Sequence, residues 1–98
     1  MRDQQILEQV KSTLALLSAK APGRAIEVRV PPYAAVQCGD GPTHTRGTPP
    51  NTIEMSADTW LALASGKLSW SDAMSSGAIA ASGVRADLTE YLPLGSEA

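Results

Sequence analysis

The chain has few of the residues that carry catalytic or metal chemistry. It contains one cysteine, one histidine and no phenylalanine among its 98 residues. A lone cysteine cannot form an internal disulfide, so the fold requires no oxidising compartment. A metal site needs three or four clustered ligands, and Cys38, Asp40 and His44 are too few. We therefore expect no metal site and no cofactor.

Charge and aromatic content argue against a nucleic-acid partner. The 8 basic and 10 acidic residues give a net charge of -2, which offers no attraction to DNA, RNA or an anionic membrane. Aromatic rings are confined to Tyr33, Trp60, Trp70 and Tyr91. Platforms on which the bases of a single strand could stack are therefore nearly excluded.

Long hydrophobic runs are also missing. The longest uninterrupted apolar run extends only from Trp60 to Ala64, whereas a membrane-spanning helix needs about 20 such residues. The N-terminal residues Arg2 to Gln5 lack the apolar core of a signal peptide. We expect a cytoplasmic protein without integral membrane association, in which residues 1–98 form a single domain.

The spacing of apolar residues predicts the order of helices and strands. Apolar residues recur every three or four positions over residues 4–21, which predicts an amphipathic helix that Asp3 can cap. Residues 26–30, 33–38 and 52–55 alternate or favour extended structure and predict strands. The second of these strands should pair back with the first.

The second half of the chain predicts shorter elements. Ser56 and Ser69 are suited to cap two helices, which Gly66 and Gly77 would end. Two elements should follow, a strand over 78–82 and a final helical turn over 87–92. The pattern favours an α/β (α+β) fold with an antiparallel or mixed sheet and helices on one face. Arg29 and Glu54 are expected to form a cross-strand pair.

Two groups of polar residues could carry chemistry. Cys38 and His44 could form a nucleophile and base, but a cysteine at the end of a strand is more often a small buried hydrophobe. His44 and Arg46 could hold a carboxylate or a polar head group, or they could simply bond to nearby carbonyls of their own loop. No G-x-S-x-G sequence occurs. We expect no catalytic residue.

A third candidate is the most apolar part of the chain, from Trp60 to Ile79. Methionine and alanine there leave room in which phenylalanine would have filled space, so the segment could line a ligand cavity. Packing of an ordinary core is the alternative reading, and composition alone does not separate the two.

The segment from Met55 to Gly83 resembles the sterol-carrier-protein family. The resemblance rests on a strand that ends in serine, an acidic and an aromatic residue, a leucine–alanine run, and spaced small residues: Ser56, Asp58, Trp60, Gly66-Lys67-Leu68, Ala73, Gly77, Ile79 and Gly83. The stretch from Ala35 to Asn51 is similar to one in small, stand-alone actinobacterial members of the family.

The resemblance implies a sheet of about five strands, helices on one face, and an apolar tunnel between them. It implies non-covalent binding or transfer of a lipid, fatty acyl chain or sterol-like molecule. The expected ligand-binding residues are Val28, Val36, Met55, Trp60, Leu61, Ala64, Met74 and Ile79, with His44, Arg46 and Arg29 as candidate partners of a polar head group. An accessory module with a filled core, binding a protein partner or a second copy, is the alternative.

Overall fold

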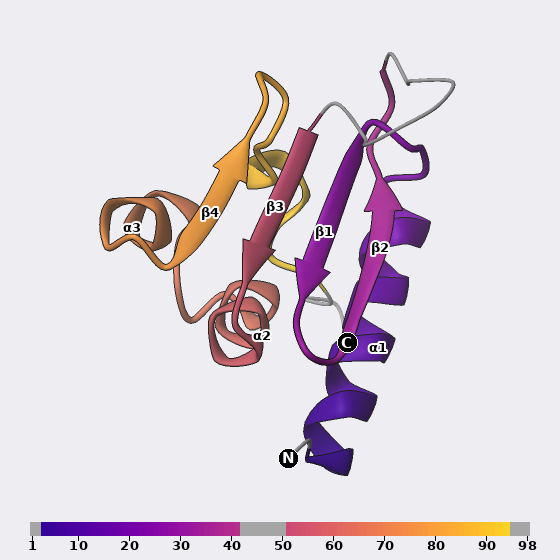
Figure 1. Cartoon of the computed structure of the whole chain (residues 1–98), viewed down its shortest axis with the longest axis vertical. Helices are drawn as coiled ribbons and strands as arrows, with labels where there is room; N and C mark the ends of the chain where they lie inside the picture. The colour runs from indigo at the N-terminus through magenta and orange to yellow at the C-terminus, as the bar shows by residue number, and fades with distance from the viewer. Residues whose placement is uncertain (1–2, 42–50, 95–98) are drawn as a thin grey trace.

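The computed structural model describes residues 3–41 and 51–94, which form a layer of helices against a sheet (Figure 1). In chain order, the elements are α1 (Gln4–Lys20), β1 (Ile26–Val30), β2 (Ala34–Cys38), β3 (Asn51–Met55), α2 (Ala57–Ser65), α3 (Trp70–Ser75), β4 (Ile79–Ser82) and the 3-10 helix η1 (Thr89–Tyr91). This order confirms the predicted succession of helices and strands.

The strands lie side by side in the order β2-β1-β3-β4. β1 pairs with β2 and β3 with β4 in antiparallel fashion, whereas β1 and β3 run parallel. The mixed sheet is therefore confirmed, but the number of strands is four in the described residues and not about five. After β4 the chain turns at Gly83 and enters η1, so the described residues beyond β4 add no further strand.

The helices begin where the sequence predicts caps. The side chains of Asp3, Ser56 and Ser69 each accept a hydrogen bond from a backbone N–H in the first turn, with distances from 2.8 to 3.2 Å. These bonds satisfy donors that the helix itself leaves unpaired. The predicted final helix over 87–92 is reduced to the single turn η1, and Leu92, which precedes Pro93, is extended.

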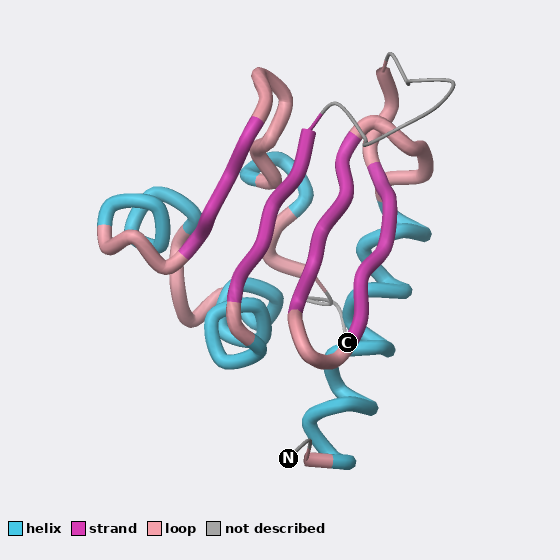
Figure 2. The backbone as a smooth tube through the Cα atoms, viewed as in Figure 1, coloured by secondary structure: helices cyan, strands magenta, loops and turns pink. Residues whose placement is uncertain are grey.

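One face of the sheet carries the core, and α1 and α2 cover that face (Figure 2). Alternate residues of the two central strands, β1 and β3, are buried against the helices, as the period of two requires. The largest side chains with almost no exposed surface come from both layers and from the segment before η1: Trp60, Leu14, Leu17, Ile53, Leu63, Leu88, Val10, Val28 and Val30.

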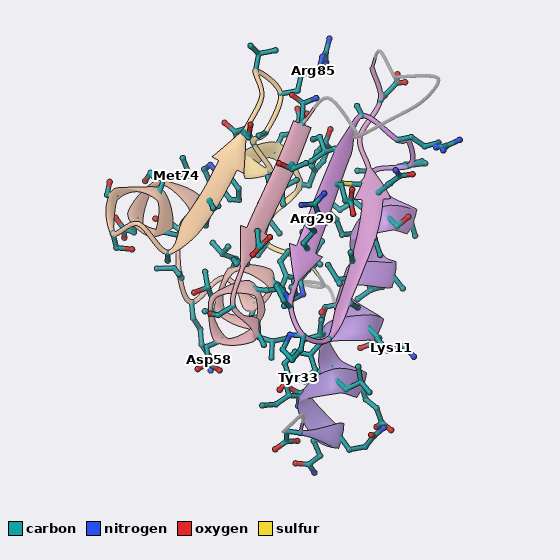
Figure 3. All side chains as sticks on the ribbon, viewed as in Figure 1. Lys11, Arg29, Tyr33, Asp58, Met74 and Arg85 are labelled. Atoms are coloured by element: carbon teal, nitrogen blue, oxygen red, sulfur yellow. The ribbon has the colours of Figure 1, made fainter. Side chains whose placement is uncertain are left out.

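The opposite face of the sheet is polar and half-buried or exposed, and Arg29 stands on it (Figure 3). The predicted ion pair between Arg29 and Glu54 is wrong, because Arg29 pairs with Glu27 instead. Arg29 Nε lies 3.3 Å from Oε2 of Glu27, two residues away on the same strand face. Glu54 lies opposite Arg29 in the β1–β3 register, and its charge makes only a minor contribution to the raised pKa of Arg29. The hydrogen bond and charge of Glu27 raise the pKa of Arg29.

Candidate functional site

The space between the sheet and the helices is filled by the side chains of the protein. Trp60 and Val28 have no exposed surface, and the indole Nε1 of Trp60 donates a hydrogen bond of 2.7 Å to Oγ1 of Thr13. A side chain with no exposed surface borders no space large enough for a water molecule. The apolar tunnel that the resemblance implies is therefore closed at these two residues.

The structure brings most of the predicted ligand-binding residues into one core, but it separates others. Val28, Met55 and Ile79 are buried in the sheet, and Val36 packs against the same core while half-buried. Met74 lies apart on α3, with 43% of its surface exposed (Figure 3).

The position of Met74 follows from the way α3 packs. Ala73 is the buried residue of this short helix, so the next residue along, Met74, turns toward solvent. His44 and Arg46 lie outside the described residues. The ligand-binding role of all these residues remains a prediction.

An open groove runs between α1 and α2. Its volume is about 380 Å³, and its lining residues are Gln9, Ser12, Thr13, Leu16, Leu61, Ala64, Ser65, Lys67 and Leu94. Two of them, Leu61 and Ala64, are predicted ligand-binding residues. Leu16 is 51% exposed, and it forms part of the apolar wall of the groove together with Leu61 and Leu94. The ammonium of Lys67 is the charged group among these lining residues.

The C-terminal segment completes the groove. The backbone N–H of Leu94 donates a hydrogen bond of 2.9 Å to the carbonyl of Ala64 at the end of α2. The ammonium of Lys20 at the end of α1 donates to the carbonyls of Tyr91 and Pro93, at 2.8 and 3.3 Å. These bonds fix Leu94 beside both helices. The groove is therefore formed by three segments that are distant in the sequence.

The sequence reasoning did not single out the other two apolar residues of the groove, Leu16 and Leu94. A signal existed for Leu16, because it lies off the buried stripe of Val10, Leu14 and Leu17. A single exposed apolar residue on a helix is common, so Leu16 becomes informative only together with the apolar residues of the other segments that line the groove. Nothing in the sequence indicated Leu94.

The thiol of Cys38 is buried at the end of β2, as predicted for a cysteine that acts as a small buried hydrophobe. Burial raises its pKa to about 11. The thiol therefore stays protonated at neutral pH, and a protonated thiol is a poor nucleophile. A catalytic role for Cys38 gains no support from this environment.

This burial has a consequence for stability against pH. Because the folded-state pKa of Cys38 lies near 11 and its ordinary value is 9.0, the folded protein holds the thiol proton more tightly. The contribution is complete below pH 9 and is lost as the pH rises through about 11.

We expect urea unfolding to show a steeper loss of stability between pH 9 and 11 for the natural chain than for the Cys38→Ala variant. The variant serves as control, because every other ionisable group is present in both proteins. Parallel curves would contradict the burial of the thiol.

Within residues 3–41 and 51–94, no three His, Cys, Asp or Glu side chains cluster as metal ligands would. The helices of these same residues include none that is both long and apolar enough to cross a membrane.

A comparison with protein families gives one match over most of the chain. Residues 2–94 match the sequence model of a family described as bacterial SCP ortholog. The match includes every strand and helix of the described residues, and thus also the α1–α2 groove. A search of curated proteins finds no match.

Proposed function

Because the chain belongs to the family of bacterial sterol-carrier-protein (SCP) orthologues, we propose that it binds a small apolar or amphipathic ligand without catalysis. A lipid, a fatty acyl chain or a sterol-like molecule has the required chemistry. The observation that carries the proposal is the apolar α1–α2 groove, with Leu61 and Ala64 in its wall. We propose a single cytoplasmic domain that acts without cofactor, metal or nucleic acid.

The groove suits one chain with an anionic end. Its volume of about 380 Å³ falls in the range of roughly 300–1,000 Å³ typical of ligand pockets. Each methylene removed from water contributes about 0.8 kcal/mol before the cost of association. Leu16, Leu61 and Leu94 supply the apolar contact, and Lys67 offers a cation for a carboxylate. Since the groove is open on one side, we expect a dissociation constant of about 10–100 µM.

Titration with dodecanoate tests the proposal, and Trp60 can report it. The indole of Trp60 is bonded to Thr13, and Thr13 lines the groove. A Trp70→Phe variant leaves Trp60 as the remaining tryptophan, so a change in emission can be assigned to this region. We expect a saturable change in emission and a rise in melting temperature with ligand concentration.

Substitutions on the surface locate the binding. Leu16→Gln is expected to weaken dodecanoate binding about fivefold to tenfold, because it removes an apolar wall of the groove. Val84→Gln is the matched control, since Val84 is a fully exposed apolar residue outside the groove lining. Equal weakening by both variants, or no saturable signal in the natural chain, would reject the α1–α2 groove as the lipid site.

The filled interior favours a second candidate, an accessory module that binds a protein partner or a second copy of the chain. Among the described strands, β2 and β4 are sheet edges with one neighbour each. Such edges can pair with another strand. Sedimentation equilibrium separates the candidates: a mass of two chains without dodecanoate binding supports the module, and a monomer that binds dodecanoate supports the carrier.

A further inference from the structure

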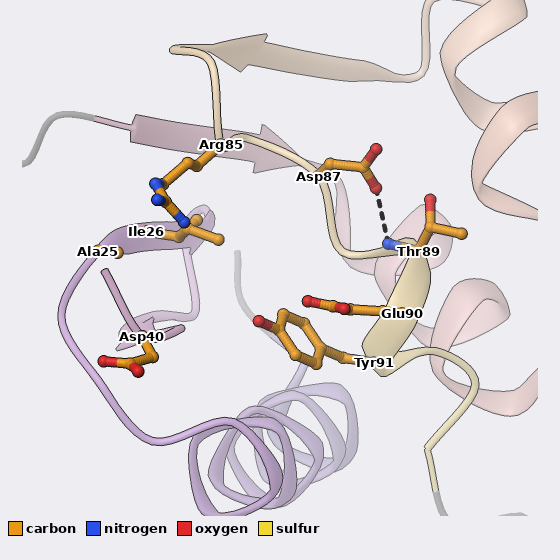
Figure 4. Close-up of a pocket in the computed structure, with 8 residues that line it drawn as sticks. All are labelled: Ala25, Ile26, Asp40, Arg85, Asp87, Thr89, Glu90 and Tyr91. Carbon is orange, nitrogen blue, oxygen red and sulfur yellow. Dashed lines mark hydrogen bonds between the residues drawn. The ribbon is translucent and has the colours of Figure 1, made fainter. Parts of the chain in front are cut away.

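A second pocket lies at the end of the sheet where β1 begins and β2 ends (Figure 4). Its volume is about 380 Å³, and it shares no lining residue with the α1–α2 groove. Its walls are Ala25 and Ile26 before and within β1, Asp40 after β2, and the segment from Arg85 to Tyr91. The proposed lipid function makes no use of it.

The walls of this pocket are held together by a buried polar side chain. Asn51 is 3% exposed, and its Nδ2 donates a hydrogen bond of 2.8 Å to the carbonyl of Ala25. Its Oδ1 accepts a bond of 2.9 Å from the backbone N–H of Arg85. The N–H of Ala25 in turn donates to the carbonyl of Gly39 at 3.1 Å. These hydrogen bonds connect the backbone of the three segments that line the pocket, so the pocket is formed without a ligand.

The charges around the pocket are opposite in sign but do not pair with one another. Arg85 reaches toward the opening from one side, while Glu90 and the hydroxyl of Tyr91 point into it from η1 (Figure 4). Among the described residues, the one ion pair within 4.0 Å joins Arg29 to Glu27. The guanidinium of Arg85 therefore stands apart from the carboxylates of Asp40 and Glu90.

The fourth charged group has a local partner. Oδ1 of Asp87 accepts a hydrogen bond of 2.7 Å from the backbone N–H of Thr89. Burial, with the neighbouring Glu90, raises the pKa of Tyr91. The phenol consequently keeps its proton at neutral pH and can both donate and accept a hydrogen bond.

We infer that this pocket binds a small zwitterion of the amino-acid type with an apolar side chain. The ligand carboxylate lies on the guanidinium of Arg85, which favours a bidentate contact. The ligand ammonium lies at the carboxylate of Glu90, in a pocket that Asp40 also makes more negative, and the side chain of the ligand covers Ile26. A simple cation would meet repulsion from Arg85, and a simple anion would meet repulsion from three carboxylates. A zwitterion satisfies both kinds of group at once.

L-leucine is the probe for a first test, with the ¹⁵N-labelled full chain observed by NMR. We expect saturable shifts at the amides of residues 25–26, 40 and 85–91, with a dissociation constant of about 1 mM, since exposed charges are screened by water. Two half-ligands serve as controls: 3-methylbutylamine lacks the carboxylate and 4-methylpentanoate lacks the ammonium. Each should bind at least about fivefold more weakly than leucine.

Two variants test the assigned contacts. Arg85→Gln and Glu90→Gln should each weaken leucine binding by about fivefold, because both side chains are exposed and their removal leaves the fold intact. Arg24→Gln is the matched control, since Arg24 is an exposed arginine that bonds to Gln37 outside the pocket.

Three outcomes would overturn the inference: no shifts with about 10 mM leucine, binding of 3-methylbutylamine as strong as that of leucine, or unchanged binding by both pocket variants. Dodecanoate binding is measured in a separate experiment at residues that this pocket does not include, so either proposal can fail while the other stands.

Discussion

Replacing Trp60 with alanine is expected to lower the free energy of unfolding by about 3–5 kcal/mol. Trp60 is the largest side chain with no exposed surface, and it packs between the sheet and α1. Its removal leaves a cavity in a closely packed core and deprives the hydroxyl of Thr13 of its donor. Since small domains are stable by only about 5–15 kcal/mol, the variant should be close to unfolding. Urea unfolding followed by far-ultraviolet circular dichroism measures the loss.

Two further variants separate the causes of that loss. Trp60→Phe keeps an aromatic ring in the core but removes the 2.7 Å hydrogen bond to Thr13, so its expected cost is about 1–2 kcal/mol. Trp70→Ala should cost less than Trp60→Ala, because Trp70 is only half-buried. Equal losses for the two tryptophan-to-alanine variants would contradict the central position of Trp60 in the core.

The fold was largely predictable because its elements are encoded by local patterns. Apolar and charged residues alternate strictly over Ile26–Val30, and such a segment has one apolar face only when it is a strand. The serines before α2 and α3 act as caps through bonds to the backbone three residues later, which depend on local sequence alone. The number of strands was less predictable. The fifth strand was an expectation from the resemblance, and no alternating run in the described residues after β4 supports it.

The candidate sites were less predictable, because each is assembled from segments that are distant in the sequence. Leu94 reaches the α1–α2 groove because its backbone is bonded to Ala64 and the chain before it to Lys20. Arg85 reaches its pocket because Asn51, at the start of β3, holds its backbone. These contacts depend on the tertiary arrangement, which periodicity and composition do not encode.

Met74 illustrates the same limit inside a single short helix. Its apolar character predicts burial, but α3 contains only the residues from Trp70 to Ser75, so it can bury one narrow side. Ala73 occupies that side. In so short a helix, moving the first residue by one position would bury Met74 and expose Ala73 instead. The sequence pattern does not locate the start of a helix to within one residue.

Replacing Gly23 with alanine is expected to destabilise the protein by about 4 kcal/mol or more. Gly23 lies in the turn between α1 and β1 with φ of 142°, a conformation that side chains rarely adopt. A Cβ atom there would stand 1.9 Å from the carbonyl oxygen of Gly39. That oxygen accepts a bond from Ala25, and the N–H of Gly39 donates to Ala21, so backbone on both sides is fixed. The collision can be relieved only by breaking the contact between this turn and the end of β2.

Gly77→Ala separates this collision from the cost of backbone conformation alone. Gly77 also has a positive φ, 78°, but a Cβ atom there would meet nothing within 4 Å. Its substitution should therefore cost only the conformational strain of about 1–2 kcal/mol. The difference between the two variants in urea unfolding then measures the packing of the α1–β1 turn on Gly39. Similar losses for both would show that this close approach is absent. Ala25 and Asp40 would then not line the proposed zwitterion-binding pocket as described, because the contact between this turn and Gly39 holds both residues in place.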